Sequence, residues 1–162
     1  MVTVRRKGGK AETIEVKIPA GIEDGFKNAM AAAREAIVVT TPEVSAVRDA
    51  DRVIGLLNSE GVKPIQLVLN RVRPKMMANQ EMLGVSDVTD ILALPLLGLV
   101  LEDEQVIVST NQGEPLVLKG TGPAAQAYMD TARRLRGEEV PFRALEDAQG
   151  LLGVLKRLFG GR

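Results

Sequence analysis

Asn70 and Arg71 are the side chains of this sequence best suited to hold a heterocyclic ring. They directly follow residues 65–69, a short apolar run typical of a buried strand. An amide can hydrogen-bond the edge of a purine, and a guanidinium can stack on its face. The same pair can also form an ordinary turn, in which Asn accepts a tight backbone angle and Arg is solvated. The pattern alone leaves both interpretations open.

Other polar segments follow strand-like runs in the same way, at residues 19–25, 41–43 and 102–104. In an open parallel sheet, ligands bind at the carboxyl ends of the strands. We therefore expect these segments to gather with Asn70 and Arg71 at one edge of a sheet.

Several kinds of catalytic site are excluded by what the sequence lacks. It contains no Cys and no His, which removes thiol chemistry, Cys/His zinc sites, disulfides and the usual general base. The phosphate-binding patterns G-x-x-x-x-G-K-[ST] and G-x-G-x-x-G are also absent. The sequence therefore predicts no metal ligands and no catalytic residues of its own.

The composition indicates one α/β domain that does not bind nucleic acid. Of the 162 residues, 45% are hydrophobic and only 2% aromatic, which suits Val, Ile and Leu strands buried on both faces. The formal net charge is zero, whereas nucleic-acid binders carry a basic excess. No apolar run approaches the roughly 20 residues of a spanning helix, and residues at the N-terminus show no signal-peptide h-region. We expect a cytoplasmic protein whose membrane contact is peripheral.

Strand and helix patterns alternate along the chain, which predicts parallel βαβ units in a layered sheet. The expected strands are residues 13–18, 36–40, 65–69 and 96–101. The first expected helix is residues 26–35. Thr41 caps a second helix that runs to about Asn58, and Ser86 and Asp87 cap a third that ends near Leu92. The fourth is residues 123–136, with Gly137 as its C-terminal cap. Residues 109–115 are expected to form a loop.

Two charged or amphipathic segments could bind partners. The helix after Thr41 places Arg48, Asp49, Asp51 and Arg52 on one face, either as solvated ion pairs or as a docking surface. Residues 150–162 form an amphipathic pattern, either an interfacial membrane helix or a helix packed on the core. Flanking Gly and Pro residues favour a detachable tail. Its apolar stripe and its cations are Leu151, Leu152, Val154, Leu155, Leu158 and Phe159, and Lys156 and Arg157.

From residue 19 onward, the sequence resembles the C-terminal half of the MinD family of ParA/MinD-type P-loop ATPases, which cycle on membranes and position bacterial division. The matching motifs occur in one order, which makes the resemblance specific. They are PAGIE at 19–23, TPEVSAVRDADR at 41–52, NRVRP at 70–74, STNQGEP at 109–115, RRLRGEEVPF at 133–142, and the tail.

The resemblance implies a fold, a domain organisation and a set of binding residues. The fold is an incomplete three-layer parallel sheet of the P-loop NTPase type that lacks the phosphate-loop half. Residues 1–18 form an N-terminal arm and strand, 19–142 the body, 143–149 a linker and 150–162 a membrane-targeting tail for the inner face of the cell membrane. Members of the family bind ATP with magnesium on its phosphates. The resemblance implies that the adenine ring is bordered by Asn70, Arg71, Leu101, Glu102 and Asp103. MinC and MinE dock around Arg48, Asp49, Asp51 and Arg52.

Departures from the family pattern indicate that this chain does not hydrolyse ATP by itself. The N-terminal half with its two-lysine phosphate loop is missing, and Lys17-Ile18 stands where the family has Asp-Ser. That aspartate would organise magnesium and the attacking water, so lysine has the wrong charge. Leu101 also replaces a usual proline beside the adenine.

Residues 12–25 also resemble a strand and turn of the C-terminal region of DnaJ-type co-chaperones. We interpret PAGIEDG as a fusion point between the two families; the alternative is a divergent MinD strand. The leading function is a MinD-like site-selection fragment that associates with anionic membrane and retains a partner surface. The alternatives are an ATPase whose other half is supplied in trans and a non-functional remnant, and self-association is expected to shield the incomplete sheet.

Overall fold

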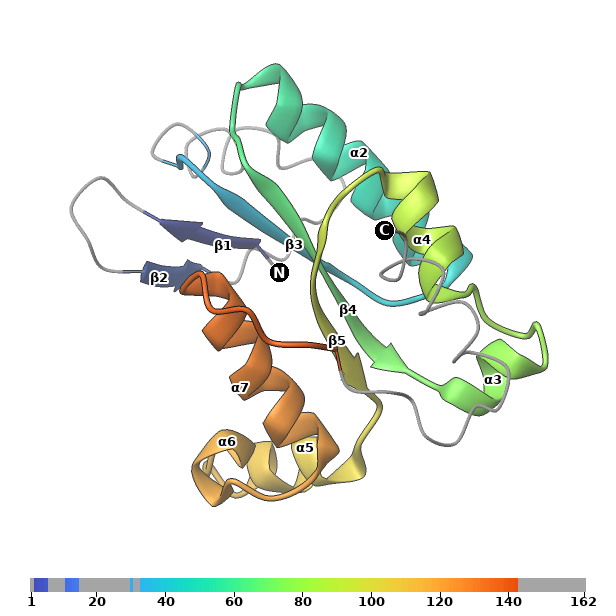
Figure 1. Cartoon of the computed structure of the whole chain (residues 1–162), viewed down its shortest axis with the longest axis vertical. Helices are drawn as coiled ribbons and strands as arrows, with labels where there is room; N and C mark the ends of the chain where they lie inside the picture. The colour runs from blue at the N-terminus through green and yellow to red at the C-terminus, as the bar shows by residue number, and fades with distance from the viewer. Residues whose placement is uncertain (1, 6–10, 15–29, 31–32, 143–162) are drawn as a thin grey trace.

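The computed structural model describes residues 2–5, 11–14, 30 and 33–142. These residues form a five-stranded sheet of order β2-β1-β3-β4-β5, with helices on both faces (Figure 1). The elements are β1 Val2–Arg5, β2 Ala11–Ile14, β3 Ala36–Thr40, α2 Val44–Ser59, β4 Ile65–Val72, α3 Pro74–Ala78, α4 Val85–Leu92, β5 Leu96–Leu101, α5 Glu104–Asn111, α6 Leu116–Lys119 and α7 Pro123–Leu135.

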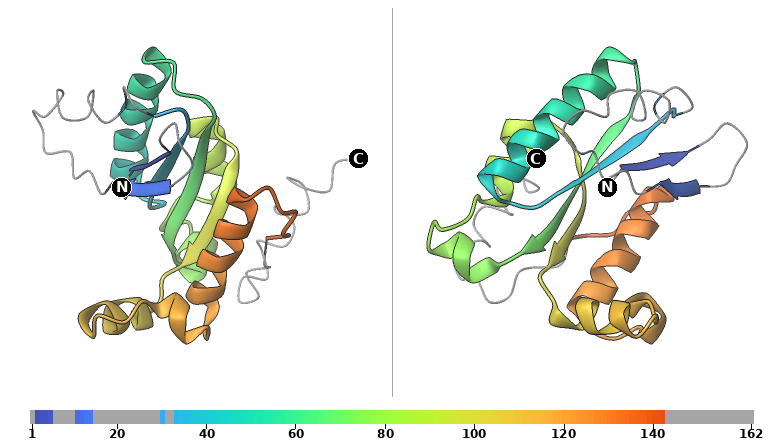
Figure 2. Two further views of the ribbon diagram at one scale, coloured as in Figure 1. Left: turned by 90° about the vertical axis from the view of Figure 1, so that its left-hand side faces the viewer. Right: turned by 180° about the vertical axis from the view of Figure 1, so that it is seen from behind.

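The centre of the sheet is the parallel strand triplet β3-β4-β5, as expected from the alternating pattern. Side chains of β4 alternate between two hydrophobic cores: Leu67 and Leu69 face α2 and α4, whereas Val68 faces α7. Figure 2 shows these helices on opposite faces. The α/β class and the layered sheet with parallel central strands are therefore confirmed.

The N-terminal edge of the sheet differs from the prediction. β1 pairs antiparallel with both β2 and β3, and Val2 lies opposite Val38. We expected a strand at residues 13–18, but the observed strand begins at Ala11, ends at Ile14 and lies at the edge of the sheet. Residues 15–18 lie outside the described part of the chain. The strand beside β3 is β1, whose alternating Val-Thr-Val pattern the prediction did not use.

The predicted N-caps Thr41 and Ser86 are wrong by two residues, whereas Asp87 takes part in capping α4 from its third helical position. Glu43, not Thr41, is the N-cap of α2, and its side chain makes no capping hydrogen bond. Pro42 is fully buried, so it packs into the core instead of taking the first helical position. In α4 the N-cap is Gly84, whose N–H donates to the Asp87 carboxylate at 3.0 Å. Tertiary packing, and not the local cap pattern, sets where these helices begin.

Two further helix boundaries differ. Residues 33–35 are not helical, although we expected a helix over 26–35; residues 26–29, 31 and 32 lie outside the described part of the chain. The expected loop at 109–115 begins inside α5, which Asp103 caps by accepting the Gln105 N–H at 2.9 Å. α6 was also unexpected. No helix of the described residues is long and apolar enough to span a membrane.

α7 confirms its prediction and packs closely on β5. It ends at Leu135, and Gly137 follows in the left-handed conformation at φ 87°. Gly98 of β5 allows the close approach, since a Cβ there would lie 2.3 Å from the Thr131 hydroxyl oxygen. The tight packing of α7 holds the second core against the sheet.

Candidate functional site at the carboxyl ends of β4 and β5

β4 extends three residues beyond its predicted end, so Asn70 and Arg71 belong to the strand. The pairing of β4 with β5 is irregular between Leu69 and Val72, where Arg71 has φ 55°. The Asn70 side-chain oxygen accepts the Arg71 N–H at 2.9 Å and so supports this left-handed backbone. Such a conformation is unfavourable for a residue other than glycine, and residues of this kind cluster at binding sites.

Arg71 and Arg73 converge on Glu102, the first residue after β5. Arg71 donates to the Glu102 carboxylate from Nε at 3.3 Å and from Nη2 at 2.9 Å, and Arg73 donates to its second oxygen from Nε. The hydrogen bond from Arg73 and the one from Arg71 lower the Glu102 pKa to about 2. The ends of the two strands are thus joined by a charged cluster, Arg71, Arg73 and Glu102, which we call the arginine cluster.

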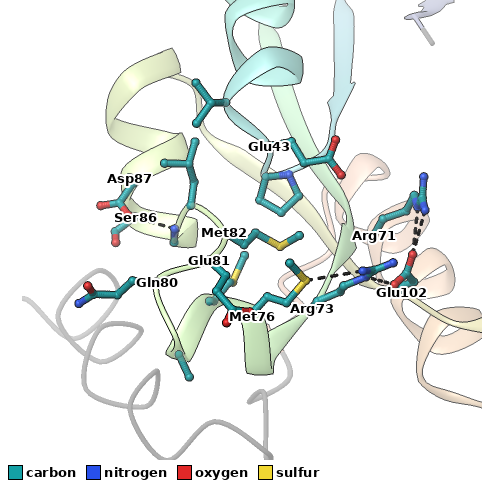
Figure 3. Close-up of a pocket in the computed structure, with 16 residues that line it drawn as sticks. Glu43, Arg71, Arg73, Met76, Gln80, Glu81, Met82, Ser86, Asp87 and Glu102 are labelled. Carbon is teal, nitrogen blue, oxygen red and sulfur yellow. Dashed lines mark hydrogen bonds and ion pairs between the residues drawn. The ribbon is translucent and has the colours of Figure 1, made fainter.

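A cavity of about 910 Å³ opens beside the arginine cluster (Figure 3). The opposite wall comes from α3 and the loop to α4, which supply Met76, Met77, Met82 and Leu83. Glu43, Glu81 and Asp87 add carboxylates to the lining. The cavity therefore combines an apolar, methionine-rich floor with acidic groups.

The predicted adenine-side residues do not all lie in this cavity. Arg71 and Glu102 line it, but Asn70, Leu101 and Asp103 do not. Burial raises the pKa of the Tyr128 hydroxyl of α7, and the nearby Asn70 side chain lowers this pKa by a smaller amount. Leu101 packs against the core on the α2 face, and Asp103 caps α5. The arginine cluster thus separates the methionine-lined cavity from a polar pair, Asn70 and Tyr128, on the α7 side.

Sequence reasoning missed Arg73 and Tyr128. The signal for Arg73 was present, because in a strand of period two Arg71 and Arg73 share one face. Tyr128 and the methionines carried no such signal, since only the packing of α7 and α3 brings them to the ends of β4 and β5.

The four residues of the predicted docking surface lie exposed on α2. Arg52 and Asp49 form one ion pair at 3.3 Å, with both side chains 73% exposed. Arg48 and Asp51 form no ion pair with a described residue. None of the four lines the cavity. The predicted tail residues, 151–159, lie outside the described part of the chain.

Asn70, Tyr128 and Arg71 offer hydrogen-bonding and stacking groups. No group of three or more acidic residues that could hold a metal ion occurs in the part of the chain that the structure describes.

The chain is similar in sequence to MinD proteins. It is 55% identical to the putative septum site-determining protein MinD of Guillardia theta, a match that covers 90% of this chain and 55% of that protein. It is 48% identical to the septum site-determining protein MinD of a Synechocystis species, over 94% of this chain and 58% of that protein. No family model matches the chain.

Solved structures lead to the same family. The MinD cell division protein of Aquifex aeolicus superposes with a TM-score of 0.73 at 46% identity, over 78% of this chain and 53% of that one. A complex of MinC and MinD from the same organism matches equally well, over 52% of that chain. A MinD of Pyrococcus horikoshii with Mg-ADP gives a TM-score of 0.64 at 27% identity, over 91% of this chain and 54% of that one.

The DnaJ resemblance of residues 12–25 receives no support from these relatives, all of which are MinD proteins. A match over 94% of the chain leaves out fewer residues than the 18 of the N-terminal arm, so MinD similarity extends into that arm. The chain is therefore homologous to the MinD septum site-determining proteins along most of its length, and it spans about half the length of the curated relatives it matches.

Proposed function

We propose that this chain acts in selecting the cell-division site as the part of a MinD-type protein that carries the adenine side of the nucleotide site, a partner surface and a membrane tail. The observation that carries the proposal is the convergence of Arg71, Arg73 and Glu102, next to Asn70, at the carboxyl ends of β4 and β5. Ligands of open α/β sheets bind at this edge.

In this proposal the chain alone contacts nucleotide weakly and does not hydrolyse ATP. Asn70 and Tyr128 can hydrogen-bond a purine, and Arg71 can stack on it. Phosphate binding needs several backbone N–H groups and a lysine at the β- and γ-phosphates, and the sequence has no such loop. The second candidate is an active ATPase formed when the other half is supplied in trans, which the MinD similarity favours.

The exposed charges of α2 make the partner surface. The solved complex of MinC with MinD from Aquifex aeolicus suggests MinC as the partner. We propose that Arg48, Asp49, Asp51 and Arg52 contribute to docking MinC, and MinE by the same surface. Arg48 and Asp51 form no ion pair with a described residue, and the Asp49–Arg52 pair is 73% exposed on both sides, so the four side chains are available to a partner.

Residues 150–162 make the membrane contact in this proposal, from the cytoplasmic side. A single short amphipathic helix binds weakly, and cations near anionic lipid add about 1 kcal/mol each. Nucleotide-driven dimerisation, which would supply a second tail, is not expected without a phosphate loop. Association should therefore be weak, salt-sensitive and independent of nucleotide.

Co-sedimentation with vesicles of anionic and neutral lipid tests this function. We expect the full chain to bind anionic vesicles, to dissociate from them as the salt concentration is raised, and to bind equally well with and without Mg-ATP. Phe159→Glu should abolish binding because it buries a carboxylate in the apolar stripe. The control is Leu118→Glu in α6, because Leu118 is 81% exposed and a charge there does not disturb the core. Its neighbour Val117 is partly buried and is therefore less suitable.

Leu118→Glu adds the same charge without touching the tail and should retain most of the binding. Binding that Phe159→Glu leaves intact would contradict the membrane function. Binding that rises steeply with Mg-ATP would favour the second candidate, the ATPase.

A further inference from the structure

We propose that the methionine-lined cavity is the docking site of this chain's own tail, residues 150–162, when no membrane is present. The inference rests on the proposed membrane function of the tail. It concerns the wall of the cavity formed by α3, the α3–α4 loop and the start of α2, which faces Arg71 and Glu102 on the other wall.

The chemistry of the cavity matches that of the tail. Met76, Met77, Met82 and Leu83 give it an apolar floor, and methionine adapts to irregular apolar partners. The tail brings an apolar stripe that includes Leu155, Leu158 and Phe159. At about 910 Å³, the cavity lies near the upper end of the ~300–1,000 Å³ typical of ligand pockets, so it can take several side chains.

The charges are also complementary. Glu81 and Asp87 line the cavity, and neither forms an ion pair with a described residue. The Arg71 and Arg73 guanidinium groups are already neutralised by Glu102. Lys156 and Arg157, on the polar side of the tail, are the cations that such a rim would attract.

The chain leaves the described structure on the side of the sheet where the cavity lies. Arg134 of α7 donates to the carbonyl oxygens of Leu97, Val140 and Pro141, and its guanidinium lies 3.9 Å from the centroid of the Phe142 ring. These contacts bring Phe142 past the start of β5, where it packs against the core of the α2 face, to which Met77 and Met82 also belong.

The remaining chain is long enough to reach the cavity. Eight residues separate Phe142 from Leu151, and in extended form they bridge about 30 Å. The linker must cover the distance from Phe142, beside the start of β5, to the cavity at Glu102. This distance is about the length of β5, whose six residues span about 17 Å. The linker can therefore place residues 150–162 over the cavity without moving any described element.

Docking and membrane binding use the same apolar stripe, so they exclude each other. The apparent affinity for vesicles is the intrinsic affinity multiplied by the fraction of undocked tails. A tail that is docked nine times in ten would bind vesicles about tenfold more weakly than a free one.

A fluorescence experiment on the full chain tests the docking. The sequence contains no Trp, so Phe159→Trp creates a single reporter in the tail. Without lipid, we expect blue-shifted emission and protection from acrylamide, both unchanged on dilution. Glu81→Lys in this background should shift the emission to the red, remove the protection and raise affinity for anionic vesicles several-fold.

Glu60→Lys is the matched control, because it changes the net charge equally at the far end of α2, roughly 24 Å from the cavity. It should leave the emission unchanged and raise vesicle affinity less than Glu81→Lys does. Equal effects of the two variants, or a solvent-exposed tryptophan in the absence of lipid, would overturn the docking while leaving membrane binding intact. A signal lost on dilution would overturn it in favour of a second copy's tail. Failure of every variant to bind vesicles would instead refute the proposed membrane function.

Discussion

Gly98 is the residue at which a single added carbon has the clearest consequence. Its Cβ would lie 2.3 Å from the Thr131 hydroxyl oxygen and 3.1 Å from the Thr131 Cβ, so α7 would have to move from β5. We expect Gly98→Ala to lower the free energy of unfolding by about 1–3 kcal/mol, measured by chemical denaturation.

Gly55 provides the opposite case. It lies inside α2, and a Cβ there would meet nothing within 4 Å. Gly55→Ala should raise the free energy of unfolding by up to about 1 kcal/mol, because alanine is the better helix former. If Gly98→Ala left stability unchanged or raised it as Gly55→Ala does, the close packing of α7 on β5 would be refuted.

Glu102 should make stability depend on pH in the acid range. Its folded pKa of about 2 lies below the ordinary value of 4.5, so its stabilising effect is present above pH 4.5 and is lost as pH falls toward 2. The melting temperature of the wild type should fall more steeply between pH 5 and 2 than that of Glu102→Gln.

Glu60→Gln serves as the control for this pH dependence, since the Glu60 carboxylate forms no ion pair with a described residue. Its melting profile should keep the wild-type slope. Identical slopes for Glu102→Gln and the wild type would show that the arginine cluster does not hold the strand ends together in solution.

The sequence predicts those parts of the site that follow from local patterns and strand order, and not those that depend on tertiary packing. The gathering of Arg71 and Glu102 at one edge of the sheet was predictable, because polar segments that follow neighbouring parallel strands meet there; their ion pair was not predicted. Asn70 lies on the α7 side, as strand alternation from Val68 predicts. The burial of Val72 on the α2 face beside Leu69 could not be predicted, since it depends on the irregular pairing between these two residues. A one-residue irregularity reverses the face on which a side chain lies.

At the scale of elements, α7 depends on Arg134 for its connection to β5. The guanidinium donates to three carbonyl oxygens, those of Leu97, Val140 and Pro141, at 3.2, 2.7 and 2.9 Å. Arg134→Met should lower the free energy of unfolding by about 1–3 kcal/mol because partly buried carbonyl groups lose their donor. Hydrogen exchange should show faster opening of residues 138–142.

Arg136→Met is the matched control, since the Arg136 side chain is 78% exposed and its contact with Glu138 is 3.9 Å long. It should change stability by less than about 0.5 kcal/mol. A comparable loss from both variants would mean that the Arg134 hydrogen bonds do not support the end of α7.

The long, strongly patterned elements were predictable, and the element ends were not. β3, β5 and α7 agree with their predictions because apolar periodicity and capping glycine act within a few residues. The start of α2 was wrong because burial of Pro42 overrode a favourable cap. β1 was missed because its place beside β3 depends on pairing between residues more than 30 positions apart.

At the scale of the whole molecule, nucleotide should leave stability nearly unchanged. A ligand present at a hundred times its dissociation constant would stabilise the fold by about 2.7 kcal/mol. We expect cooperative unfolding of the full chain with the same melting temperature in Mg-ATP and in buffer, measured by calorimetry. A clear rise would favour the ATPase candidate, and the absence of any transition would favour a non-functional remnant.

The order of the parallel strands has a consequence for synthesis. β3, β4 and β5 are neighbours in the sheet and follow one another along the chain. Each strand that leaves the ribosome thus finds its pairing edge already formed, and only the crossovers of 24 and 23 residues between neighbouring strands must close. Ribosome-bound chains that end after β5 should already resist protease, before α7 has been made.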